Sequence, residues 1–157
     1  MKKLTTIIFI AILSSTAHAQ IDFDNPPWDL SCDTLFTQTD LNICSFDEYM
    51  IADSILKDYY AQLETYLAAR IQEEEAAHDD DSDAFHGDLI QQLKNQKTAL
   101  IDSKSDFEAY KNSTIDFIGL QYEGGSIRSL IVNHYAMELT INQIKVLSEF
   151  MDELVQN

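Results

Sequence analysis

Residues 122–131 read YEGGSIRSLI, and this stretch decides the fold because it interrupts two long helical patterns. Gly124 and Gly125 are two of only four glycines in the 157-residue chain. Glycine readily adopts the left-handed conformation that ends many helices, and serine is a favourable cap for the helix that follows. Two helices joined by so short a connection are antiparallel neighbours. The stretch therefore predicts a helical hairpin that turns at the two glycines, with a new helix capped by Ser126.

Apolar residues recur at spacings of three and four on both sides of this turn and again nearer the N-terminus, which is the period of an α-helix. The pattern predicts helices over about 39–76, 87–121 and 126–155, with a loop at about 77–86 where like charges cluster. No strand pattern is strong, so we expect an all-α, antiparallel three-helix bundle. The predicted inner faces are Leu41, Cys44, Ala52, Ile55, Leu56, Tyr59, Leu63, Tyr66 and Leu67; Leu89, Leu93, Leu100, Phe107, Tyr110 and Phe117; and Ile127, Leu130, Ile131, His134, Met137, Ile141, Ile144, Leu147 and Met151.

The first 19 residues have the features of a secretory signal peptide. Lys2 and Lys3 precede a mostly apolar run, and a small-x-small cleavage signal ends at Ala19. The run of roughly 14 residues is too short to span a bilayer, which takes about 20. The sequence predicts a signal peptide over 1–19 and a soluble exported chain, without a membrane span, that begins at Gln20. We expect a periplasmic location, with secretion as the alternative.

Both prolines and the only tryptophan lie in residues 20–31, which we expect to form an extended lead-in to a helical domain over 32–157. Packing of Trp28 on the bundle is preferred to an exposed contact role. In an exported chain, Cys32 and Cys44 are predicted to form a disulfide near the N-terminal end of the bundle, with free thiols as the alternative. A metal site would need further Cys or His residues nearby, and the sequence has none there.

The chain is strongly acidic, with 27 Asp and Glu residues against 10 Lys and Arg and a formal net charge of −17. This charge excludes nucleic acid as a partner, because polyanions repel, and attracts cations and basic proteins. The densest run is 73–88, EEEAAHDDDSDAFHGD, which is either a solvated end of the bundle or a binding site for a cationic partner. Its candidate binding residues are Glu73, Glu74, Glu75, Asp79, Asp80, Asp81 and Asp83.

The sequence contains no constellation of catalytic residues. His78 and His86 fall in the acidic loop, where nothing would position them as a general base, and His134 has the spacing of a part-buried packing residue. No nucleophile elbow is present. Alternating aspartates from Asp79 onward resemble the start of a calcium loop, but the glycine and the final glutamate of such a loop are missing. We therefore predict a protein that is not an enzyme and has neither a cofactor nor a metal site.

Four segments follow a pattern known from one protein family. Residues 32–63, CDTLFTQTDLNICSFDEYMIADSILKDYYAQL, contain two cysteines around a Thr-Gln…Asn motif, then an Ala-Asp pair and a Leu followed by a Tyr. With the Gly-Gly-Ser turn, they resemble the lysozyme inhibitor LprI-like N-terminal domain family over about 30–145. Where the family has Trp and Arg, this chain has Phe107 and Lys111. The matching residues are Cys32, Thr37, Gln38, Leu41, Asn42, Cys44, Ala52, Asp53, Leu56, Tyr59 or Tyr60, Tyr110, Gly124, Gly125, Ser126, Leu139 and Thr140.

The resemblance implies a small exported helical protein that inhibits lysozymes, many of which are strongly basic. Inhibition would be steric, by covering the cleft in which the enzyme's two carboxylates act, with no turnover. The contact would be made by the acidic cluster or by the turn from Tyr122 to Ser126, for which a plain helix connection is the alternative. The alternative function is a periplasmic binding module for another basic protein or a cation.

Overall fold

The structure is a computed structural model, and it describes residues 21–77 and 84–156. Within these residues it contains one short 3-10 helix, three long α-helices and no strand, which confirms the predicted fold class. The elements are η1 (Cys32–Thr34), α1 (Gln38–Ala77), α2 (Ala84–Gln121) and α3 (Arg128–Gln156). The predicted signal peptide lies outside the described residues, and so do His78, Asp79, Asp80, Asp81 and Asp83.

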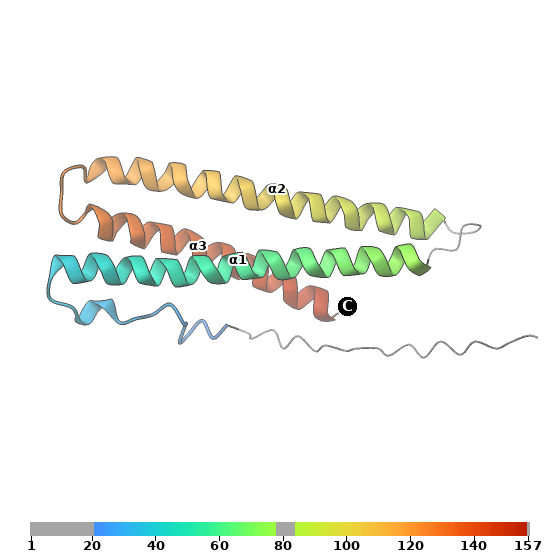
Figure 1. The fold of residues 1–157 in the computed structure, drawn as a ribbon, viewed down its shortest axis with the longest axis horizontal. Helices are drawn as coiled ribbons and strands as arrows, with labels where there is room; N and C mark the ends of the chain where they lie inside the picture. The colour runs from blue at the N-terminus through green and yellow to red at the C-terminus, as the bar shows by residue number, and fades with distance from the viewer. Residues whose placement is uncertain (1–20, 78–83, 157) are drawn as a thin grey trace, which may run out of the picture.

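The side-chain contacts between helices define their directions. Asp53 and Glu75 of α1 pair with Lys111 and Lys94 of α2, so residue numbers rise along one helix as they fall along the other. Tyr60 and Tyr66 of α1 instead bond to residues 143 and 154 of α3, in parallel order. Figure 1 shows the resulting arrangement, in which α2 runs back alongside α1 and α3 crosses α1 in the same direction as α1.

The core lies mainly between α1 and α3. Its fully buried apolar side chains come from these two helices and from Trp28, whereas α2 adds half-buried residues such as Leu100 and Phe107. Each fully buried aliphatic side chain contributes about 1.5–3 kcal/mol, so most of the apolar stabilisation belongs to the α1–α3 pair. The buried core cluster consists of Trp28, Ala52, Leu56, Tyr60, Leu63, Ile144, Leu147 and Met151.

The predicted inner face of α2 is wrong at two positions. Tyr110 is 57% exposed and Phe117 is 65% exposed, whereas Lys111, between them in sequence, is 1% exposed. Lys111 occupies the inward position because it pairs with a buried carboxylate of α1. The prediction also fails on α3 at Ile127, which is exposed beside the turn.

The lead-in packs on the bundle, as predicted for Trp28. Trp28 is 5% exposed and belongs to the core cluster, and the ring of Phe23 packs against the indole in a tilted arrangement at a centroid distance of 6.0 Å. The backbone N–H of Leu30 donates a hydrogen bond to Glu48 at 3.0 Å. Figure 1 shows this segment running back along α1 from the end where the disulfide lies.

The Gly-Gly-Ser turn has the predicted left-handed glycine. Gly124 has a φ of +78°, a conformation that costs a side-chain-bearing residue energy. The next helix begins one residue later than a cap at Ser126 would place it, because the carbonyl of Ile127, rather than that of Ser126, accepts the first α-helical bond, from Ile131. Behind the turn, the guanidinium of Arg128 donates a hydrogen bond to the carbonyl of Gly119 at 3.0 Å. The guanidinium lies against the backbone of Gly119, so a side chain at position 119 would obstruct this contact.

Cys32 and Cys44 form the predicted disulfide, with a Cα–Cα distance of 5.8 Å. It ties η1 to the second turn of α1 and closes a loop with a sequence separation of 12 residues. In the chain-entropy account, closing such a loop removes freedom mainly from the unfolded state.

We expect Cys32→Ala/Cys44→Ala to lower the free energy of unfolding by about 3 kcal/mol, the value for a loop of this length. Urea denaturation followed by circular dichroism measures the change. The matched control is reductant, which should destabilise the wild type and leave the double variant unchanged. A loss below about 1 kcal/mol would show that the bridge adds little to stability.

Beyond the end of α3, the first two helices continue as a pair. Tyr66 contacts the carbonyl of Leu154 near the end of α3, whereas α1 extends to Ala77. Figure 1 shows α1 and α2 projecting past the end of α3, where α1 ends and α2 begins. Of the helices in the described ranges, none combines the length and apolar character needed to cross a membrane.

Candidate functional site

The Gly-Gly-Ser turn and the start of α1 meet at one end of the bundle. The side-chain amide of Asn42 donates to the carbonyl of Ser126 at 3.2 Å. Asn133 of α3 in turn donates to the carbonyl of Asn42 at 3.3 Å and to the hydroxyl of Ser45 at 3.1 Å. These bonds fix the turn against α1 and α3, and they give Asn42 and Ser126, both part of the family pattern, a structural role.

The turn itself is exposed, as a binding loop would need to be. Tyr122, Gly124, Gly125 and Ser126 all lie on the surface, with Tyr122 36% exposed. The Gly125 N–H donates to the carbonyl of Tyr122 at 3.0 Å, so the turn is closed by its own backbone. The arrangement presents a short, ordered protrusion rather than a pocket.

The described part of the acidic cluster lies at the opposite end and is partly neutralised. Arg70 pairs with Glu73 and with Glu74, each at 2.9 Å, and Lys94 of α2 pairs with Glu75 at 2.7 Å. Pairing of this kind weakens the field that these carboxylates present to a cationic partner.

The two candidate surfaces predicted from the sequence cannot belong to one small site. Asn42 bonds to the Gly-Gly-Ser turn, whereas Glu73 lies 31 residues further along the same helix. At 1.5 Å per residue this corresponds to about 45 Å. A compact partner would engage one end of the bundle or the other.

No described group of side chains has the character of a metal site. The one cluster of potential ligands is Cys32, Cys44 and Glu48, and its two sulfurs are bonded to each other, so they offer no thiolate. His134 is exposed rather than part-buried, against the prediction, and lies 3.7 Å from Glu138 on the same helix.

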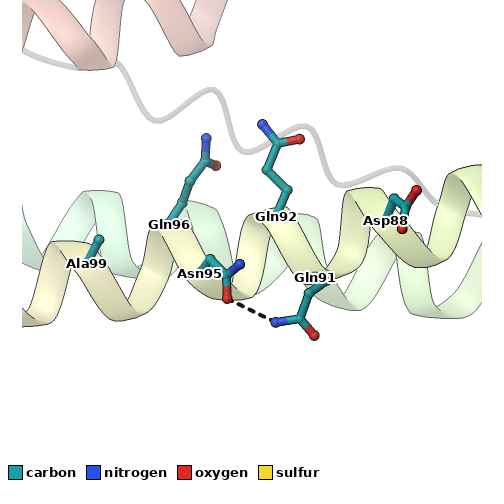
Figure 2. A pocket seen from close by; sticks show the side chains of 6 residues that line it. All are labelled: Asp88, Gln91, Gln92, Asn95, Gln96 and Ala99. Atoms are coloured by element: carbon teal, nitrogen blue, oxygen red, sulfur yellow. Dashed lines mark hydrogen bonds between the residues drawn. The ribbon is translucent and has the colours of Figure 1, made fainter.

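A shallow depression on α2 is lined by six residues of that helix alone. Figure 2 shows Gln92 and Gln96 extending to one side, whereas Gln91 and Asn95, joined by a hydrogen bond of 2.9 Å, lie on the other. Side chains that diverge in this way do not converge on a ligand. The lining residues are Asp88, Gln91, Gln92, Asn95, Gln96 and Ala99.

A buried charge network joins α1 to α2. The Lys111 ammonium donates to Asp53 at 2.8 Å and to Glu108 at 3.1 Å, and Lys57 pairs with Asp53 from the solvent side at 2.5 Å. The Lys111 nitrogen also lies over the Tyr49 ring, 5.5 Å from its centroid. Asp53 matches the family pattern and Lys111 stands where the family has Arg, and the burial of both indicates that these positions serve helix packing.

The network shifts the pKa values of its members. Burial alone would raise the pKa of Asp53, but hydrogen bonds from Lys111 and Lys57 outweigh it and hold the pKa below 3.8. Burial alone would lower the pKa of Lys111, but hydrogen bonds to Asp53 and Glu108 outweigh it and raise the pKa above 10.5. The Asp53–Lys111 pair therefore stabilises the fold while both groups are charged. Its contribution is lost as the pH falls below 3.8 or rises above 10.5.

Exposed apolar side chains are concentrated at the disulfide end, which the sequence pattern did not predict. Of the 14 large hydrophobic residues that the structure shows exposed in its described part, 11 lie within 30–50 or 110–135. The Asn42 contacts bring these two segments together. Such clustering marks interaction surfaces, whereas isolated exposed apolar residues need no explanation. The eleven are Leu30, Phe36, Ile43, Phe46, Met50, Tyr110, Phe117, Leu120, Tyr122, Ile127 and Tyr135.

Comparison with known proteins places this arrangement in a family. Residues 32–147 match the profile of the family described as Lysozyme inhibitor LprI. A protein named Uncharacterized protein R02472, from Rhizobium meliloti (strain 1021), is 27% identical over 141 residues, which cover 90% of each chain. No solved structure matches significantly. The family match begins at Cys32 and includes the disulfide, the buried Asp53–Lys111 pair and the Gly-Gly-Ser turn, so this chain belongs to the lysozyme inhibitor LprI family.

Proposed function

We propose that this protein is exported to the periplasm, after removal of residues 1–19, and inhibits lysozyme there by binding without catalysis. The observation that carries the proposal is the family match, which includes nearly all of the helical domain. The net charge of −17 supports it, because an acidic protein attracts a basic enzyme over a distance of about a Debye length.

The mechanism is steric. Lysozyme cleaves its polymer between two carboxylates in a cleft, and a bound protein at the mouth of that cleft excludes the substrate. The bundle offers rigid helices and an ordered turn for this contact, with no turnover of its own. Electrostatic attraction would raise the association rate, and the fit of the contact surface would set the dissociation rate.

The test mixes the chain from Gln20 onward with hen lysozyme and follows the lysis of bacterial cell walls. We expect micromolar protein to slow lysis, more strongly at low than at moderate salt, because screening weakens the attraction. A matched assay uses a neutral soluble oligosaccharide. Inhibition should persist there if the cleft is covered, since mere competition with the anionic wall for a cationic enzyme would leave hydrolysis of the neutral substrate unchanged.

Two outcomes would contradict the proposal. If neither substrate is protected at micromolar protein, the chain is not a lysozyme inhibitor. If calorimetry detects binding while hydrolysis of the neutral substrate continues, the chain is a binding module for basic proteins, the alternative function.

A further inference from the structure

The outer face of the first turns of α1 carries a stripe of exposed apolar side chains. Ile43, Phe46 and Met50 are between 43% and 57% exposed. Their spacings of three, four and seven residues place them on one face of the helix. We call these three residues the α1 stripe. No contact with α2 or α3 covers more than part of it, although the disulfide and the Asn42 bonds hold this section of α1 in place.

Two carboxylates lie along one edge of the α1 stripe. Asp40 lies three residues before Ile43, and Asp47 lies three residues before Met50, so both lie alongside the stripe on the helix surface, and both are exposed. Residues 30–56 contain no Lys or Arg at all. Between 105 and 127 the one basic residue is Lys111, which is buried and paired. Arg128, beside the turn, adds one positive charge, and its guanidinium donates to the carbonyl of Gly119. The disulfide end therefore combines apolar area with an excess of negative charge.

We infer that the α1 stripe, with Asp40 and Asp47, is the surface that docks the basic partner, and this inference rests on the proposed function. The occupant is a protein surface in which an apolar group is surrounded by Lys or Arg side chains. Apolar anchors inside a charged rim give specific, steered association. A second copy of this chain is the disfavoured occupant, because two copies with a net charge of −17 each, and with carboxylates beside the stripe, would repel each other.

The position of the stripe agrees with the rest of that end. The Gly-Gly-Ser turn is bonded to Asn42, the residue just before Ile43, so the turn and the stripe can contact one partner together. The paired glutamates at the far end lie too distant to take part. The docking end is therefore the disulfide end, including the turn from Tyr122 to Ser126, and not the acidic cluster.

The test variant is Ile43→Gln/Phe46→Gln, which removes two apolar side chains. Glutamine has a high helix propensity, so the helix itself is preserved. The matched control is Ile101→Gln/Val146→Gln, which changes two residues of similar exposure, 48% and 58%, outside this end. We expect the dissociation constant for hen lysozyme, measured by calorimetry, to rise at least about tenfold for the stripe variant and less than about twofold for the control. Circular dichroism melting curves should coincide for both variants.

A charge variant, Asp40→Asn/Asp47→Asn, separates attraction from contact. We expect it to lower the association rate and flatten its dependence on salt, with a smaller change in the dissociation rate. If the association rate and its salt dependence stay at the wild-type values, the carboxylates do not flank the docking surface and the inference fails.

The outcomes separate this inference from the proposed function. If the wild type inhibits lysozyme and the stripe variant inhibits equally, the stripe is not the docking surface while the proposed function stands. If the wild type neither binds nor inhibits, both are overturned. If sedimentation shows a wild-type dimer that the stripe variant abolishes, the occupant is a second copy and the inference is wrong.

Discussion

Replacing Lys111 with methionine should lower the free energy of unfolding by about 3 kcal/mol, because the change leaves a buried carboxylate without its main partner. Loss of one member of a buried ion pair costs about 3–5 kcal/mol. The lower end of that range applies here because Lys57 still pairs with Asp53 from the solvent side. Urea denaturation at pH 7 measures the difference between Lys111→Met and the wild type.

Two further variants serve as comparisons for Lys111→Met. Lys104→Met removes an exposed lysine of the same helix, which lies over the Tyr60 ring at 5.8 Å, and should cost less than about 1 kcal/mol. Adding Asp53→Leu to Lys111→Met should recover much of the loss, because replacing both charges leaves neither unpaired. If Lys111→Met alone is as stable as the wild type, the buried pair is not needed for stability.

The pH dependence provides a further check on the same pair. The pKa of Asp53 is held below 3.8 in the fold, so its ionised form stabilises the protein above that pH. Once the carboxyl is protonated, Lys111 no longer pairs with a charge. The stability difference between Lys111→Met and the wild type should therefore shrink as the pH falls below 3.8. A difference that stays constant with pH would contradict an ionic origin.

Replacing Trp28 with alanine should lower the free energy of unfolding by about 3–5 kcal/mol, the range for removal of a large buried aromatic side chain. Its indole lies in the core cluster although the residue belongs to the lead-in. The matched control is Phe36→Ala, which removes an aromatic side chain that is 99% exposed and should change stability by less than about 0.5 kcal/mol. Thermal melting and urea denaturation measure both variants.

The Trp28 variant also tests whether the lead-in is part of the folded domain. If it is, Trp28→Ala should shift a single cooperative transition, because the segment and the helices unfold together. A wild-type midpoint in the variant would mean that the lead-in rests on the bundle without stabilising it.

Much of the fold could be predicted from the pattern of residues along the chain. The 3.6-residue period of the apolar residues gave three helices, and the predicted ends of the first, at about 39 and 76, differ by one residue from Gln38 and Ala77. The two glycines predict a left-handed turn because glycine adopts that conformation readily, and the structure places it at Gly124. The disulfide followed from two cysteines in an exported chain. These features depend on local backbone chemistry, which a sequence states directly.

The candidate site was harder to predict for a physical reason. Tyr110 and Phe117 have helical spacing with Phe107 and so were assigned to the inner face, yet they are exposed. On a helix of about 3.6 residues per turn, a long series of apolar residues can form two overlapping stripes, and the partner helix selects between them. Here Asp53 of α1 selects Lys111, and the neighbouring aromatic residues turn outward.

The sequence by itself determined the helices, the turn, the disulfide and the excess of negative charge, because each follows from residues close together in the chain or from a sum over all of them. Only the tertiary structure decided where charge and apolar area remain uncompensated. It paired Glu73, Glu74 and Glu75 with Arg70 and Lys94 at one end. At the other end it left Ile43, Phe46 and Met50 exposed beside Asp40 and Asp47, which form no ion pair within the described residues. Pairing and exposure depend on contacts between distant residues, which the order of residues does not reveal.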